Sequence, residues 1–321
     1  MSRISWRRAV AALALGASAV LLSACGSSST ESQLQPARLL VFGDAFSDVG
    51  QTGARYTVND GTTNHWLLQL ASDYGRTLTP SASGGTGYAR VGARIAGKPG
   101  VTGDATTLTV TEQVDAFVAG GGTFASDDLV ILSGGMSDAL FEAKAFLAGT
   151  QTADTAVANA RAAGTALANL AKRLVDAGAK QVVVVGAINL GITPWGQATG
   201  QYDTLNAISR NVNDAFLIDS VNLGLGSNVL YVDAPYYFNI AAEDPGNFSM
   251  NNSKGVACTS VDAGVGIGIG AGEVNSALCT TSTIASGVSY NSYMFADKLY
   301  VTPNLQRLFG TYAYDRIRNR W

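Results

Sequence analysis

Four short apolar runs, separated by segments with the spacing of amphipathic helices, constrain the fold of this 321-residue chain more than any other feature. The runs are RLLVF at 38–42, DLVILS at 128–133, QVVVV at 181–185 and VLYVD at 229–233. Strands that are apolar on both faces are typical of a parallel sheet covered by helices on either side. We expect helices at 66–74, 152–177, 202–221 and from Pro303, with Thr302 as the N-cap of the last. The pattern therefore predicts an α/β fold, a three-layer α/β/α sandwich around a mainly parallel sheet.

The chain divides into three parts by composition. Residues 1–24 have the character of a targeting segment, and residues 25–36 are rich in Ser, Thr and Gln, which predicts a flexible tether. Residues 37–321 carry the predicted sheet and are expected to form one domain. Its periodicity fades between Asn239 and Val288, where Gly, Asn, Ser and Thr dominate, and we interpret this stretch as a long excursion from the domain. Ligands of parallel sheets bind beyond the carboxyl ends of the strands, so a site is expected in the loops that follow the four apolar runs.

The first 25 residues have the pattern of an export signal. Three arginines precede an apolar stretch at 9–22 that is short for a membrane-spanning helix. The stretch ends at LSAC (22–25), which resembles the bacterial lipobox, where the cysteine is acylated and becomes the new N-terminus. The alternative is an ordinary cleaved signal followed by an unrelated cysteine. The resemblance implies a lipid on Cys25 that anchors the chain to a membrane of the bacterial cell envelope, and Gly26 favours the outer membrane.

Charge and residue types exclude several classes of partner. The chain has 21 basic and 24 acidic residues, a formal net charge of −3, and lacks long basic runs, so we expect no nucleic-acid partner. It has one histidine and no Cys-x-x-Cys pair, so we expect no metal site, and no motif indicates a cofactor. Outside the cytosol, Cys258 and Cys279 are expected to form a disulfide that closes the Gly-rich excursion. The alternative is two unpaired buried thiols.

Five short blocks in the predicted domain share the order and spacing of one enzyme family. The blocks are Gly43-Asp44-Ala45-Phe46-Ser47-Asp48, Tyr88-Ala89-Arg90-Val91-Gly92-Ala93, Gly135-Met136-Ser137-Asp138, Asn189-Leu190-Gly191-Ile192-Thr193-Pro194 and Phe295-Ala296-Asp297-Lys298-Leu299-Tyr300-Val301-Thr302-Pro303. Together they resemble the SGNH or GDSL family of ester hydrolases, and the resemblance runs from about Arg38 to Trp321. It implies an SGNH-hydrolase-like sheet of the flavodoxin-like type.

The resemblance also implies a catalytic triad, and this chain departs from it. In the family a serine attacks the ester, a histidine takes its proton, and an aspartate three residues before the histidine orients it. Ala45 stands at the nucleophile position and Tyr300 at the base position, while Asp297 keeps the aspartate. Of the family's oxyanion donors, Gly92 matches and Ser137 replaces an asparagine. A lost serine or base costs on the order of a million-fold in a comparable triad, so we expect family-type hydrolysis to be lost or nearly so.

Four other residues near these blocks have competing interpretations. Asp44 and Asp138 are expected to be structural, accepting loop N–H groups near the site. Ser47 is expected to cap the following segment, and its alternative role is that of a substitute nucleophile. His65 is the sole histidine, and no spacing pairs it with a serine.

Three functions follow from these alternatives. The first is a degenerate hydrolase that acts by binding, with an acyl or glycan ligand, or by structure. The second is an active hydrolase of acyl, lipid or carbohydrate esters that uses a nucleophile such as Ser47. The third is a scaffold for other envelope proteins.

Overall fold

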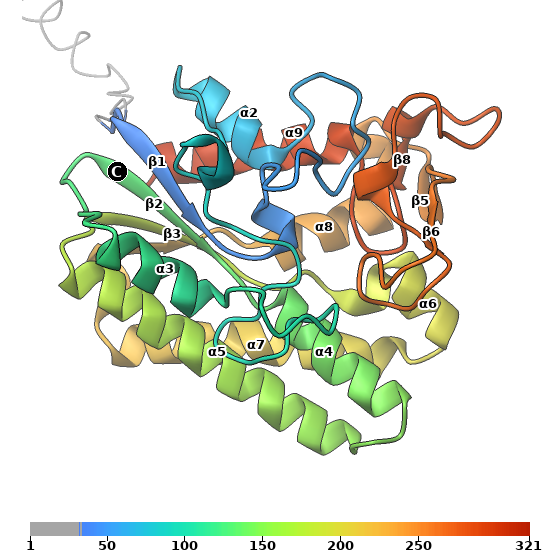
Figure 1. Ribbon diagram of the computed structural model, residues 1–321, viewed down its shortest axis with the longest axis horizontal. Helices are drawn as coiled ribbons and strands as arrows, with labels where there is room; N and C mark the ends of the chain where they lie inside the picture. The colour runs from blue at the N-terminus through green and yellow to red at the C-terminus, as the bar shows by residue number, and fades with distance from the viewer. Residues whose placement is uncertain (1–31, 33) are drawn as a thin grey trace, which may run out of the picture. The chain divides into compact units, whose positions relative to one another are not determined.

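Four parallel strands form the central sheet of the computed structural model, which describes residue 32 and residues 34–321 (Figure 1). They are β1 (Arg38–Phe42), β2 (Asp128–Ser133), β3 (Gln181–Val185) and β4 (Val229–Tyr231), in that order across the sheet. The four predicted strands are confirmed, although β4 ends two residues earlier than expected because Asp233 caps the next helix. The predicted signal peptide at 1–24 and Cys25 lie outside the described residues, as does most of the predicted tether at 25–36.

Helices flank the sheet on both sides. They are α2 (Trp66–Asp73), α3 (Val110–Ala119), α4 (Met136–Leu147), α5 (Ala153–Asp176), α6 (Pro194–Thr199), α7 (Tyr202–Asn222), α8 (Ala234–Glu243) and α9 (Pro303–Arg318). The predicted helices are confirmed to within a residue or two at their ends. Thr302 is the N-cap of α9, as predicted, but its side chain makes no capping bond, because its hydroxyl donates to the carbonyl of Tyr293 at 2.6 Å.

Alternate side chains of each strand enter two separate apolar clusters. In β1, Leu39 and Val41 face one cluster, and Leu40 and Phe42 face the other. The first cluster contains the apolar sides of α2, α8 and α9, and the second contains those of α3 and the later turns of α5. Figure 1 shows α2 and α9 on one side of the sheet and α3, α5 and α7 on the other. The three-layer α/β/α sandwich predicted from the apolar runs is thereby confirmed.

The path of the chain reverses across β1. Beyond the edge of β1 that faces away from β2, the Val41 N–H donates to Thr86 O at 3.0 Å and the Tyr88 N–H donates to Val41 O at 2.7 Å. The chain thus leaves β1 for one side and then returns to form β2 on the other. Ligand sites of open α/β sheets lie at such a reversal, so the loop after β1 is the place to look for one.

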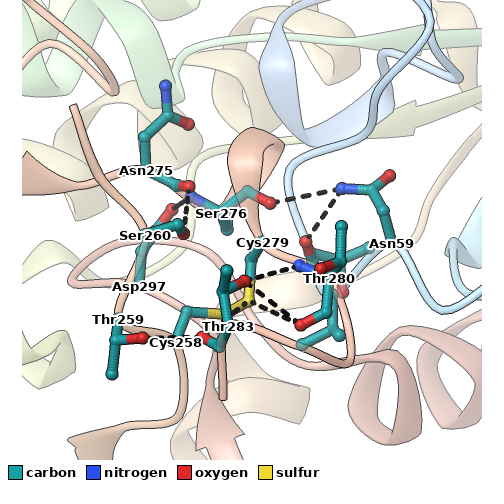
Figure 2. The surroundings of a disulfide bond; sticks show 12 residues. Asn59, Cys258, Thr259, Ser260, Asn275, Ser276, Cys279, Thr280, Thr283 and Asp297 are labelled. Carbon is teal, nitrogen blue, oxygen red and sulfur yellow. Dashed lines mark hydrogen bonds between the residues drawn. A yellow bond between two sulfur atoms is a disulfide. The ribbon is translucent and has the colours of Figure 1, made fainter. Parts of the chain in front are cut away.

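The stretch expected to be irregular contains two small sheets and begins later than predicted. Helix α8 continues through Asn239 to Glu243, and the excursion follows it. In it β5 (Asn252–Val256) pairs with β8 (Tyr293–Phe295), and β6 (Val261–Asp262) pairs with β7 (Glu273–Val274). The predicted disulfide between Cys258 and Cys279 is confirmed and sits in a small buried cluster of its own (Figure 2).

Candidate functional site

The loop after β1 presents a methyl group where a hydrolase needs a hydroxyl. Asp44 begins a single 3-10 turn, Ala45–Ser47, by accepting the Phe46 N–H at 3.1 Å. This turn places Ala45 at the carboxyl end of β1, where its side chain is 2% exposed and belongs to the apolar cluster on the α2 and α9 side of the sheet. A methyl group offers neither a nucleophile nor a hydrogen-bonding atom.

The first block is held against the second and third by hydrogen bonds. From the second block, the Arg90 N–H donates to Gly43 O at 3.0 Å and the Val91 N–H donates to Asp48 Oδ2 at 3.1 Å. Gly92 follows with a φ of +74°, a left-handed conformation that glycine adopts without strain. These bonds bring the predicted oxyanion glycine to the turn that carries Ala45.

The third block lies at the N-terminus of α4, near the first block and in contact with the segment that directly follows the second. Ser137 is in the first turn of α4, and its peptide N–H lies close enough to the Asp44 carboxylate to favour the charged form. The burial of Asp44 has the larger effect and raises its pKa to about 6. Asp138 accepts the Ile95 N–H at 2.9 Å and a weaker bond from the Arg94 guanidinium at 3.4 Å. Asp44 and Asp138 therefore each accept one backbone N–H near the site, that of Phe46 and that of Ile95.

Asp297 binds the backbone of its own turn and that of the excursion. Its Oδ1 accepts the N–H groups of Leu299 and Tyr300 at 2.8 and 2.7 Å, and its Oδ2 accepts the Ser276 N–H at 3.0 Å (Figure 2). The carboxyl group is fully buried, and this burial outweighs the hydrogen bonds and raises its pKa to about 6. Here the carboxyl that orients a histidine in the family stabilises a turn.

Tyr300 brings an aromatic ring to the base position. Its ring lies 5.0 Å from that of Tyr56, centroid to centroid, and is 4% exposed. Burial, together with the nearby carboxylates of Asp44 and Asp297, raises the pKa of the phenol well above its ordinary value near 10. The hydroxyl therefore stays protonated at neutral pH and cannot take a proton from a nucleophile.

These positions converge on one place, but that place is closed. Asp44 and Asp297, from the first and last blocks, both act on Tyr300, and Ala45 lies in the same apolar cluster as Tyr300. The five residues at the triad and oxyanion positions are all buried: Ala45, Gly92, Ser137, Asp297 and Tyr300. The arrangement thus has the layout of a hydrolase site and the packing of a protein interior.

The disulfide-closed excursion contributes to this closure. Ile267, in the Gly-rich segment between β6 and β7, is 1% exposed and belongs to the cluster that contains Ala45. Its neighbour Gly268 lies against Val101, where even a methyl group would approach within 3.3 Å. Val101 in turn donates its N–H to the carbonyl of Gly92 at 3.0 Å. The excursion therefore packs directly on the loop that carries the predicted oxyanion glycine.

The Ser47 side chain is bound to the central sheet. Its side chain is fully buried, and its hydroxyl donates to Ser133 Oγ at 2.7 Å, at the end of β2. The expectation that Ser47 caps the following segment is wrong, because the N–H groups of Gly50 and Gln51 donate to Asp48, whereas the Ser47 hydroxyl binds the end of β2. A serine held in this way is a poor candidate for a nucleophile.

His65 has a structural role that its sequence context did not reveal. It is the N-cap of α2, where its Nδ1 accepts the Leu67 N–H at 3.2 Å. Complete burial lowers the pKa of the imidazole to about 3, so it is neutral at physiological pH. The usual N-cap residues are Ser, Thr, Asp and Asn, so a histidine at that position does not indicate a helix start in the sequence.

The described residues form neither a metal site nor a membrane-crossing helix. Across this part of the chain, no group of three or more His, Cys, Asp or Glu side chains is placed to hold a metal ion. Nor does any helix in it have the length and apolarity that a membrane crossing requires.

Comparison with known proteins agrees with the resemblance of the blocks. No curated protein matches the chain. The model of the family described as GDSL-like Lipase/Acylhydrolase matches residues 39–251, about two thirds of the chain, and includes the blocks that carry Ala45, Gly92 and Ser137. Asp297 and Tyr300 lie beyond the matched span, and their place in the pattern depends on the blocks and on the contacts given above. The chain belongs to the GDSL-like lipase and acylhydrolase family.

Proposed function

We propose that this chain is a cell-envelope lipoprotein in which the family's hydrolase site has lost ester hydrolysis, so that the protein acts by binding a ligand or by structure. The observation that carries this proposal is that Ala45 and Tyr300, at the nucleophile and base positions, are both buried in one apolar cluster. The first residue lacks a nucleophile, and the second is a phenol whose raised pKa keeps it protonated. At most, the roughly 10³–10⁴-fold acceleration attributed to binding and an oxyanion hole would remain.

Covalent labelling tests the loss of a nucleophile. The purified protein is incubated with a fluorophosphonate probe, which reacts with activated serines. We expect no labelling, since Ser47 is buried and its hydroxyl donates to Ser133. Labelling that disappears in Ser47→Ala would support the alternative of an active ester hydrolase. The matched control is Ser133→Ala, which removes the acceptor of the same hydrogen bond but not the Ser47 hydroxyl.

The membrane anchor is a separate part of the proposal. The LSAC pattern at 22–25 supports a lipid on Cys25, and Gly26 supports the outer membrane. The full chain, expressed in a bacterium fed an alkyne-tagged palmitate, is expected to incorporate the tag and to fractionate with the outer membrane. Cys25→Ser is expected to abolish both, whereas Cys258→Ser should leave the tag in place. An untagged wild-type chain would contradict the anchor and leave the proposal about the hydrolase site standing.

A further inference from the structure

Strand β4 is an exposed edge of the central sheet. It is the last strand in the sheet order and pairs only with β3. All three of its residues are partly exposed, whereas β1, β2 and β3 are buried along nearly their whole length. Free edges are commonly protected by charged side chains, proline or a bulge. Strand β4 is short, but its sequence Val229-Leu230-Tyr231 has none of these, and its register with β3 is regular. The edge is therefore open to a further strand.

The outer side of β4 presents unpaired backbone groups. The carbonyl of Asn228 accepts an N–H of β3, and the Val232 N–H donates to a carbonyl of β3, each at 2.9 Å. Because backbone groups alternate in direction along a strand, those of Leu230 also point at β3, and those of Val229 and Tyr231 point outward. Within the described part of the chain, no segment bonds to these outward groups. An antiparallel strand laid against them would form two hydrogen-bonded residue pairs.

An apolar groove lies between this edge and α7. It has a volume of about 440 Å³, and its lining includes Leu217, Val221, Leu225 and Val229. Leu217 and Val221 are one turn apart on the same face of α7, and they are 39% and 78% exposed. Among the described residues, Val221 is the most exposed large apolar side chain. Clustered apolar exposure of this kind is typical of a protein–protein interface.

The start of β4 is flanked by positive charge. The guanidinium of Arg320 donates to the carbonyl of Gly226, which places it just before the strand. Lys180 lies beside the same end, because its carbonyl accepts a bond from Asn228 Nδ2 at 3.0 Å. Both basic side chains belong to exposed residues. A partner with negative charge at this point would be favoured.

The carboxyl end of β4 has the opposite balance. Asp233 follows the strand and caps α8. Asp214 and Arg210, both on α7, line a cavity together with Asp233 and Tyr231. Asp214 and Arg210 form only a loose and exposed pair at 3.7 Å. One positive and two negative side chains leave a net formal charge of about −1 at this end. The edge is therefore complementary in charge to a copy of itself that runs in the opposite direction.

We propose that a second copy of this chain pairs with β4, so that two β4 strands lie antiparallel about a two-fold axis at Leu230. Val229 of each copy then forms a hydrogen-bonded pair with Tyr231 of the other, and the positive end of each edge meets the negative end of its partner. Since the axis is perpendicular to the sheet, the two α7 helices lie on the same face, where Leu217 and Val221 of both copies cover the apolar grooves. This association does not depend on the loss of ester hydrolysis.

Disulfide cross-linking of the full chain tests the register. In an antiparallel pair centred on Leu230, that residue faces its own copy, with the two Cα atoms about 4.5 Å apart, a distance that a disulfide can bridge. Under mild oxidation, Leu230→Cys should give a covalent dimer on a non-reducing gel. The matched control is Val118→Cys, an exposed position on α3, which packs on β1, and it should stay monomeric.

Sedimentation velocity of the purified full chain in detergent measures the association itself. We expect a monomer–dimer equilibrium that shifts towards dimer as the protein concentration rises. Val221→Arg and Arg320→Glu should each weaken dimerisation at least tenfold, which is about 1.4 kcal/mol. Val118→Arg and Lys254→Glu make the same kinds of change at exposed positions elsewhere and should leave the dissociation constant unchanged.

Three results would overturn the proposal. The first is a single monomeric species at every concentration. The second is a dimer that Val221→Arg leaves unchanged, because such a dimer uses another surface. The third is cross-linking of Leu230→Cys only to a different protein, which would assign the edge to another partner. None of these results bears on ester hydrolysis, so this proposal and the proposed function can fail separately.

Discussion

Asp297→Asn should change the pH dependence of stability in a direction that tests how the site has been rebuilt. In this chain the Asp297 carboxyl is fully buried and accepts three backbone N–H groups, from Ser276, Leu299 and Tyr300. Two effects on its pKa oppose each other, because burial disfavours the carboxylate and the three donors favour it. Burial is the larger effect and raises the pKa to about 6.

The sign of the pH dependence follows from that value. The folded-state pKa of about 6 lies above the ordinary value of 3.8, so the folded protein binds the proton more tightly than the unfolded chain does. The contribution of Asp297 to stability is therefore fully present below pH 3.8 and is lost as the pH rises through 6. Between pH 7.5 and pH 5 this group adds about 1.3 kcal/mol to the free energy of unfolding. An asparagine cannot add it, because its amide does not titrate.

Urea unfolding of the disulfide-intact protein at pH 5 and pH 7.5 measures this difference. The stability gap between wild type and Asp297→Asn should be about 1.3 kcal/mol larger at pH 5 than at pH 7.5. Tyr300→Phe is the control, because it keeps the carboxyl and its turn, and the phenol with its raised pKa stays protonated throughout. A gap that is equal at the two pH values, or larger at pH 7.5, would mean that the three donors dominate and would refute the reasoning.

Three further predictions concern other buried features. His65→Asn keeps an N-cap on α2 but removes an imidazole whose folded-state pKa of about 3 lies below its ordinary 6.5, so wild type loses stability as the pH falls through 6.5. In urea unfolding, the variant should gain about 2 kcal/mol relative to wild type between pH 7.5 and pH 5. A stability difference between the two proteins that is the same at both pH values would contradict this prediction. Cys258→Ser with Cys279→Ser opens a loop with a sequence separation of 21 and should lower the free energy of unfolding by about 3 kcal/mol. Thermal unfolding measures the loss, and a double variant that melts at the same temperature as wild type would contradict it. Ser47→Ala removes a buried bond to Ser133 and should cost about 1 kcal/mol in urea unfolding, and an equally stable variant would show that the bond contributes nothing.

The central sheet could be predicted from the sequence because each strand is apolar on both faces and bounded by turn residues. All four runs became the strands of one parallel sheet. The helices α4 and α8 were harder to predict, because their apolar residues recur less regularly at the helical spacing than those of α2 and α5 do. Helix α3 did carry a signal, because Thr109 and Glu112 form a capping box that is visible in the sequence.

The positions of the candidate site residues could be predicted from the sequence, but their burial could not. The blocks identified Ala45, Asp297 and Tyr300 by their spacing, and the fold brings them together. The burial of that place involves Tyr56, from the loop that follows the first block, and Ile267, from the excursion, and neither residue belongs to a motif.

The rate of p-nitrophenyl butyrate hydrolysis by the purified protein tests the central claim most directly. With a methyl group at position 45 and a protonated phenol at position 300, wild type should release nitrophenol no faster than a heat-denatured sample does. Ala45→Ser combined with Ser137→Asn and Tyr300→His should exceed that background if the restored groups meet in the folded protein. Turnover by wild type at the rates of ordinary esterases would contradict the claim.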